Sequence, residues 1–222
     1  MKEVAEGVSL LRGRLPIPYA INTYLVDDVL VDAGGRTDAG TILRELRGRP
    51  LAAHAITHAH PDHQGSSHRV CSERSVPFWV PEADVAPAED SGLIRRRQPN
   101  HPMAQIMDRI FTGPGHPVDR ILREGDEVAG FEVLDTPGHS AGHVSLWRES
   151  DRTLIAGDVL ASQDPLLGRR GLRLPQDFFS PDPEGNRRSA KRLGELEPAT
   201  VLFGHGPPVR DTRAFVDFCA TL

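Results

Sequence analysis

Four residues that can bind a metal ion lie within six positions of the chain, in the segment HAHPDH. They are His58, His60, Asp62 and His63. Imidazole nitrogens and carboxylate oxygens are side-chain groups that bind Zn²⁺ and other transition-metal ions. Alternation along an extended chain puts His58 and His60 on the same side, and Pro61 is typical of the first turn of a helix, which would carry Asp62 and His63. The segment therefore predicts two pairs of metal ligands that face one spot from two elements.

Three further residues of ligand type each follow a predicted strand. They are His139 in FEVLDTPGHSAGH, Asp158 in TLIAGDV and His205 in TVLFGHG. In layered α/β folds, functional groups gather at the carboxyl ends of strands. The glycines beside these residues permit the tight turns that aim their side chains. Together the seven residues predict one metal site.

The elements that position these residues are predicted from hydrophobic periodicity and from turn and cap signals. Short apolar runs predict strands over residues 21–26, 29–31, 52–57, 131–134, 143–147, 153–156 and 200–203. Apolar residues at helical spacing, with caps and prolines, predict helices over about 37–46, 61–74, 103–111, 183–197 and 213–219. Strands that alternate with helices favour a layered α/β fold with mixed sheets.

The length and charge favour one globular domain over residues 1–222 and exclude several kinds of partner. A chain of 222 residues can bury a full core as a single domain. The formal net charge of -5 leaves no basic field for a polyanion, so we expect no nucleic-acid partner. No apolar run approaches the roughly 18 residues of a membrane span, and the first residues do not form a secretory signal. We therefore expect a cytoplasmic protein, with no membrane association, that acts on a small molecule.

Residues 77–118 differ in composition from the rest of the chain, because they contain seven prolines among mostly polar stretches. We predict a variable insertion over the core, which together with residues 160–182 rims the site and selects the substrate. The segment GRRGLR is predicted to be a solvated loop that carries Arg169, Arg170 and Arg173. Alternatively, these arginines could bind one phosphate or carboxylate of a small molecule. Nothing in the pattern indicates an oligomeric state.

Five motifs in order along the chain resemble those of the metallo-β-lactamase-fold superfamily. They are Asp32 in LVDAGG, HxHxDH over residues 58–63, His139, Asp158 and His205. The fold that this resemblance implies is a four-layer αβ/βα sandwich, in which helices flank two mixed β-sheets and the metal site lies at one edge of the sheets. The nearest-looking branch is the glyoxalase-II-like one.

The resemblance also implies which residue does what. A first metal would be held by His58, His60 and His139, a second by Asp62, His63 and His205, and Asp158 would bridge the two. Three imidazoles leave an open position for water, as in catalytic zinc sites, and zinc lowers the pKa of bound water to about 7. We expect two Zn²⁺ per chain, with iron or manganese as alternatives, and catalytic roles for Asp62 and Asp158.

The reaction predicted is hydrolysis of a small ester, lactone or thioester, in which a metal-bridging hydroxide attacks the carbonyl carbon. The presence of Asp158 argues against a true β-lactamase. Only 17 residues follow His205, so the glutathione-binding extension of true glyoxalase II is not expected. The lactonase branch supplies a tyrosine soon after the bridging aspartate, whereas this chain has DVLASQD there.

Two other classes of function remain open. One is an oxidoreductase similar to sulfur dioxygenases, in which His58, His60 and His139 hold a single iron. The other is a catalytically silent binding scaffold, against which the retention of all seven ligand-type residues weighs. Asp32 is predicted either to hold a ligand or to cap a turn, and His143 to be structural or to support a ligand without binding metal.

Overall fold

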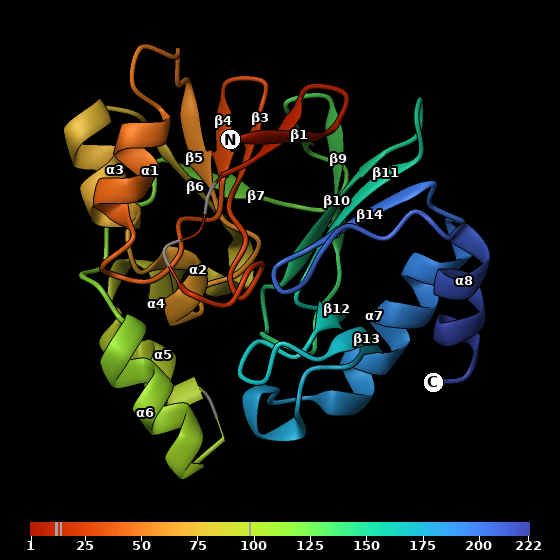
Figure 1. Cartoon of the computed structure of the whole chain (residues 1–222). Helices are drawn as coiled ribbons and strands as arrows, with labels where there is room; N and C mark the ends of the chain where they lie inside the picture. Colours follow the sequence, from red (N-terminus) through yellow and green to blue (C-terminus); the bar gives the residue numbers. More distant parts are fainter. Residues whose placement is uncertain (12, 14, 98) are drawn as a thin grey trace.

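The protein is described by a computed structural model that covers residues 1–11, 13, 15–97 and 99–222. Two mixed sheets lie against each other, and helices cover their outer faces (Figure 1). This arrangement is the predicted layered α/β fold. No helix among these residues is both long and apolar enough to cross a lipid bilayer.

The first sheet has seven strands in the order β1-β2-β3-β4-β5-β6-β7. Their bounds are β1 Lys2–Ala5, β2 Val8–Leu10, β3 Tyr24–Val26, β4 Val29–Val31, β5 Ala53–Ala55, β6 Phe78–Pro81 and β7 Arg120–Leu122. Strands β1 to β4 pair antiparallel, and β4 to β7 pair parallel. The carboxyl ends of β4, β5, β6 and β7 therefore meet at one edge of this sheet.

The second sheet has five strands in the order β14-β11-β10-β9-β8, and a two-stranded ribbon, β12-β13, lies beside it. Their bounds are β8 Glu127–Val128, β9 Phe131–Asp135, β10 Val144–Arg148, β11 Thr153–Gly157, β12 Ala161–Gln163, β13 Arg170–Arg173 and β14 Thr200–Phe203. Strands β11 and β14 are parallel, so their carboxyl ends also share one edge.

The helices are mostly short. Their bounds are α1 Ala39–Glu45, α2 Pro61–Gln64, α3 Ser67–Arg74, α4 Val85–Glu89, α5 Gly92–Arg97, α6 Pro102–Phe111, α7 Pro183–Glu195 and α8 Thr212–Ala220, with 3-10 turns η1 Glu82–Asp84 and η2 Asp177–Phe179. Helices α1 and α3 cover the first sheet, while α7 and α8 cover the second.

Alternation along the strands divides the core into layers. In β4, Val29 and Val31 face the other sheet, whereas Leu30 packs with Ile42 of α1. In the second sheet Leu146 and Ile155 face inward, and their strand neighbours pack against α7 and α8. The two sheets therefore share one core layer, and each has a second core layer beneath its helices.

Two predicted segments fold differently from expectation, and the structure also has strands that were not predicted, among them β1, β2 and the β12-β13 ribbon. The helix predicted over 61–74 is two helices, which are separated at Gly65 and Ser66, and a Cβ at Gly65 would lie 2.3 Å from the carbonyl oxygen of Phe111. The segment predicted as an insertion from residue 77 begins with β6, a strand of the first sheet whose Phe78 is fully buried. The excursion from the sheet therefore starts only after Pro81 and carries α4, α5 and α6.

Candidate metal centre

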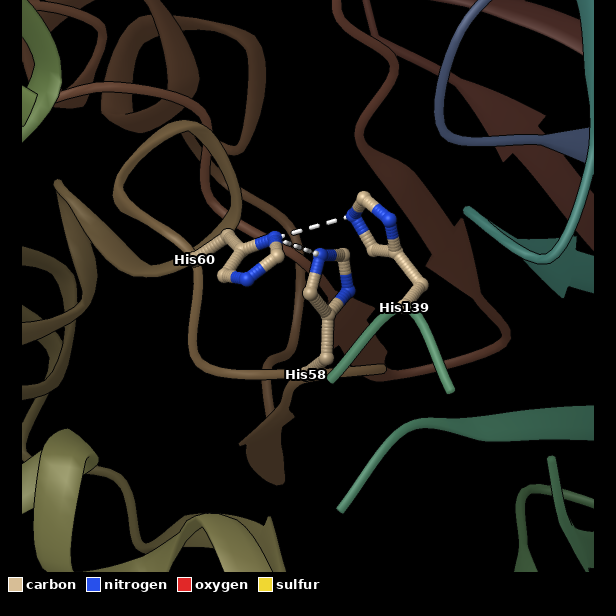
Figure 2. Close-up of side chains that lie close together, drawn as sticks. All are labelled: His58, His60 and His139. Carbon is tan, nitrogen blue, oxygen red and sulfur yellow. Dashed lines mark hydrogen bonds between the residues drawn. The ribbon is translucent and has the colours of Figure 1, made fainter. Parts of the chain in front are cut away.

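Three histidines meet at the junction of the two sheets. His58 and His60 follow β5, and His139 lies in the loop between β9 and β10. His60 Nδ1 lies 3.0 Å from His58 Nε2 and 2.9 Å from His139 Nε2 (Figure 2). Nitrogens this close together can all lie about 2 Å from a single ion, which is the usual Zn–N distance. The three residues therefore form a first group of ligand type.

The local backbone explains how this group is aimed. His60 is extended, as a residue before proline must be, and Pro61 then starts α2. Gly138 has φ +132°, and a Cβ there would lie 2.1 Å from the backbone nitrogen of Asn186 in α7. Only glycine lets the loop that carries His139 pack so closely against α7.

A second group lies beside the first and consists of Asp62, His63 and His205. Asp62 and His63 come from α2, and His205 follows β14. Asp62 Oδ2 lies 3.4 Å from His205 Nε2 and 3.9 Å from His63 Nε2. Gly204 leaves room for this group, because a Cβ at that position would lie 2.0 Å from an oxygen of Asp158.

Asp158 lies between the two groups. Its Oδ2 is 3.4 Å from His139 Nε2 in the first group, and 3.3 Å and 3.0 Å from His63 Nε2 and His205 Nε2 in the second. One carboxylate thus contacts nitrogens of both groups. The structure brings all seven residues that the sequence singled out into one cluster.

Two atoms of the cluster test whether metal ions fit it. Among the described residues, His63 Nε2 and Asp158 Oδ1 are buried and have no hydrogen-bond partner. Buried polar atoms normally have partners, so these two atoms fit a cluster that a bound cation would complete. Imidazole nitrogens and carboxylate oxygens are suitable donors for zinc, iron or manganese.

Neighbouring groups fix which histidine nitrogen faces the cluster. His63 Nδ1 donates to Asp32 Oδ2 at 2.9 Å, and His205 Nδ1 donates to the Ala20 carbonyl. The Thr57 hydroxyl donates to Asp32, so it accepts from His58 Nδ1 at 3.0 Å. In each of these rings Nε2 is the nitrogen that faces the cluster, as in histidines that bind a metal through Nε2.

Asp32 and His143 support the cluster without belonging to it. Asp32 holds His63 and also accepts from the backbone N–H of Thr57 at 2.8 Å, so it both holds a ligand-type residue and fixes the loop after β5. His143 Nε2 accepts from the backbone N–H of Asp158 at 2.9 Å. Burial lowers the pKa of His143 to about 3, which keeps this ring neutral and able to accept.

Asp84 is a functional residue that the sequence analysis missed. Its carboxylate is 2% exposed and accepts from Ala59 N at 2.9 Å, from Ser140 Oγ at 2.8 Å and from Gly142 N at 3.1 Å. These bonds tie the loop of His58 and His60 to the loop of His139. No local pattern around Asp84 signals this role, because all three donors are distant in sequence.

Burial and charge set opposite protonation states within the cluster. Burial, together with neighbouring histidines, holds the pKa values of His58 and His139 well below the ordinary value, so both rings are neutral. Burial also disfavours the charged form of His63, but the carboxylates of Asp158, Asp32 and Asp62 raise its pKa well above the ordinary value. Asp158 is buried, yet His205 and His63 hold its pKa well below the usual range. Without metal the cluster therefore holds neutral His58 and His139, protonated His63 and ionised Asp158, and a cation bound at His63 would take the place of its proton.

A cavity of about 250 Å³ opens onto the cluster. The side chains of ligand type that line it are His60, Asp62, His139, Asp158 and His205. His58 and His63 are fully buried beneath them. A small molecule in this cavity would lie directly against the cluster.

Two mixed sheets between layers of helices, with buried histidines and carboxylates at their junction, define a metal-binding protein with an accessible site. A family model of the metallo-beta-lactamase superfamily matches residues 16–205. The probable metallo-hydrolase YflN of Bacillus subtilis (strain 168) is 31% identical over 93% of this chain and 86% of its own length. The chain belongs to the metallo-beta-lactamase superfamily, as its motifs predict.

Two further similarities bear on the site. A hydroxyacylglutathione hydrolase of Bdellovibrio bacteriovorus is 28% identical over 87% of this chain, which spans 62% of that relative. The crystal structure of TTHA1623 in a di-iron-bound form superposes with a TM-score of 0.70 and 28% identity, over 94% of this chain and 96% of that one. These matches confirm the predicted fold type and a relationship to metallo-hydrolases.

Proposed function

We propose that this protein is a dinuclear metallohydrolase that cleaves a small ester, thioester or lactone. The observation that carries the proposal is the position of Asp158 between two groups of ligand-type atoms at the floor of a cavity. His58, His60 and His139 would hold one ion, and Asp62, His63 and His205 the other, with Asp158 shared. Two Zn²⁺ ions suit these donors best, and iron or manganese suits them too.

The residues of the site then have distinct tasks. When bound, a pair of such ions supplies a hydroxide nucleophile at neutral pH and polarises the carbonyl under attack. Asp62 and Asp158 provide the negative charge that retains two dications. The Asp62 side chain is 26% exposed and lines the cavity, so it also contacts the substrate, whereas Asp158 is nearly buried. Asp32 and His143 keep His63 and Asp158 in place.

The named relatives support a hydrolase that uses two ions. One of them is a hydroxyacylglutathione hydrolase, and the related structure TTHA1623 is in a di-iron-bound form. We expect the same class of chemistry here, while the substrate of this chain depends on its own cavity.

Elemental analysis of the purified protein tests the proposal, combined with assays on esters, thioesters and lactones. We expect close to two ions per chain and turnover that both fall in Asp158→Ala. The matched control is Asp217→Ala on α8, whose side chain is 70% exposed. One iron per chain with oxygen uptake on persulfides would replace the proposal with the dioxygenase alternative, and no metal after reconstitution would favour the scaffold.

A further inference from the structure

The cavity above the metal centre has one polar side and one apolar side. The polar side is the row of ligand-type residues described above. The apolar side is formed mainly by Ile21, Met107, Phe111, Leu160, Leu174 and Phe179. Helix α6 supplies Met107 and Phe111, and the segment around β12 and β13 supplies the last three of these residues; both lie at the same end of the molecule (Figure 1). The cavity wall away from the ligand-type residues is therefore mostly hydrocarbon.

The charged side chains on this apolar side are already paired. Arg173 lies 3.3 Å from Asp164 Oδ2 through Nη1, and its Nε and Nη2 donate to backbone carbonyls of the same β12-β13 hairpin. Asp164 also accepts from two backbone N–H groups at 2.9 Å. Asp108 accepts from the Thr112 hydroxyl at 2.8 Å. Among the described residues that line the cavity, Arg173 is the one arginine or lysine, and Asp164 already balances its charge.

The volume limits the length of what can bind. A cavity of about 150 Å³ holds benzene, so a cavity of about 250 Å³ holds roughly ten non-hydrogen atoms, enough for an acyl chain of about six to eight carbons with its carbonyl oxygen and leaving atom. We propose that the substrate carries an uncharged, apolar acyl chain of about six to eight carbons, which lies between α6 and the β12-β13 segment with its carbonyl at the metal centre. This inference rests on the proposed hydrolase function and names its substrate class.

Transfer of hydrocarbon out of water gives the size of the expected preference. Each methylene buried in the cavity stabilises the bound state enough to raise kcat/KM up to about fourfold. The gain ends when the cavity is full. A terminal carboxylate on the acyl chain removes this gain in kcat/KM, because burying an unpaired charge is costly.

The test uses the metal-loaded protein and two series of compounds. The first series is p-nitrophenyl esters and thioesters with acyl chains of two to twelve carbons, plus succinyl and adipoyl monoesters. We expect kcat/KM to rise two- to fourfold per carbon, to level off at six to eight carbons, and to be at least tenfold lower for the charged chains. The second series is methyl ketones, which cannot be hydrolysed, and calorimetry should show 2-nonanone binding more tightly than 2-pentanone.

A pair of neighbouring phenylalanines provides the variants. Phe179 lines the cavity, whereas Phe178 is equally half-buried, stacks on His101 and does not line it. Phe179→Ala should move the plateau to longer chains in both series, and Phe178→Ala should leave it unchanged.

The outcomes separate this inference from the proposed function. Chain-length-dependent binding of ketones with no hydrolysis of any substrate would refute the hydrolase and leave the apolar cavity supported. Hydrolysis with a kcat/KM that does not depend on chain length, or that is highest for the succinyl ester, would overturn the acyl-chain inference. The proposed hydrolase function would still be supported.

Discussion

Replacement of Asp84 by asparagine should loosen the metal centre without removing any ligand. The Asp84 carboxylate accepts three hydrogen bonds, whereas an asparagine amide has only one oxygen and presents N–H groups on its other side. Either Ala59 N–H or Gly142 N–H then faces a donor. Loss of a charge-assisted bond and one unpaired buried donor together cost about 3 kcal/mol. For a chain of this length that lowers Tm by roughly 6–12 °C.

Thermal unfolding of the metal-free protein measures this cost apart from any contribution of bound ions. Asp90→Asn is the matched control, because Asp90 lies in the same segment, is exposed and accepts a single bond from Gly92. Ser140→Ala, which deletes one of the three bonds, should cost only about 1 kcal/mol. We also expect Asp84→Asn to weaken metal binding roughly 10- to 100-fold, as for other groups that orient metal ligands. A Tm and a metal affinity equal to those of wild type would refute the idea that Asp84 ties the two ligand loops together.

Three further predictions concern the metal, His143 and the pH dependence of stability. Removal of metal by a chelator should abolish hydrolysis, and added Zn²⁺, Fe²⁺ or Mn²⁺ should restore it; activity that survives a metal content near zero would contradict the mechanism. His143→Phe leaves the Asp158 N–H without its acceptor, so we expect stability to fall by about 2 kcal/mol in urea unfolding and turnover to fall at least tenfold. Burial lowers the pKa of His54 to about 4. As the pH falls below about 6.5, the unfolded chain therefore binds a proton at His54 that the native protein does not bind, and the native state loses stability. Between pH 7 and pH 5, metal-free wild type should lose about 2 kcal/mol more stability than His54→Gln. Equal pH slopes in urea unfolding would show that His54 does not titrate in this way.

The sequence predicts the cluster well because its residues obey local rules. His58 to His63 stand at a strand end and a proline-initiated helix, and His139, Asp158 and His205 each follow a strand beside a glycine. Such signals depend on a few adjacent residues, so periodicity and turn chemistry are enough to find them. The structure places all of these residues together.

The structural features that the sequence does not predict depend on contacts between distant segments. Nothing near Asp84 shows that its three donors come from residues 59, 140 and 142. Likewise β6 reads as part of a proline-rich insertion, although it pairs between β5 and β7. In both cases the partners come from segments that are distant along the chain, which no local pattern records.

The distribution of the ligand-type residues along the chain has a consequence for protein synthesis. His58, His60, Asp62 and His63 leave the ribosome early, whereas His205 follows roughly 140 residues later, which at ordinary rates of translation is about 7 to 30 seconds. During that interval a nascent chain displays part of a chelating site but cannot assemble β11 beside β14, the pair that brings Asp158 and His205 together. Assembly of the complete cluster therefore waits for residue 205, and a chain released before that residue lacks one member of the second group.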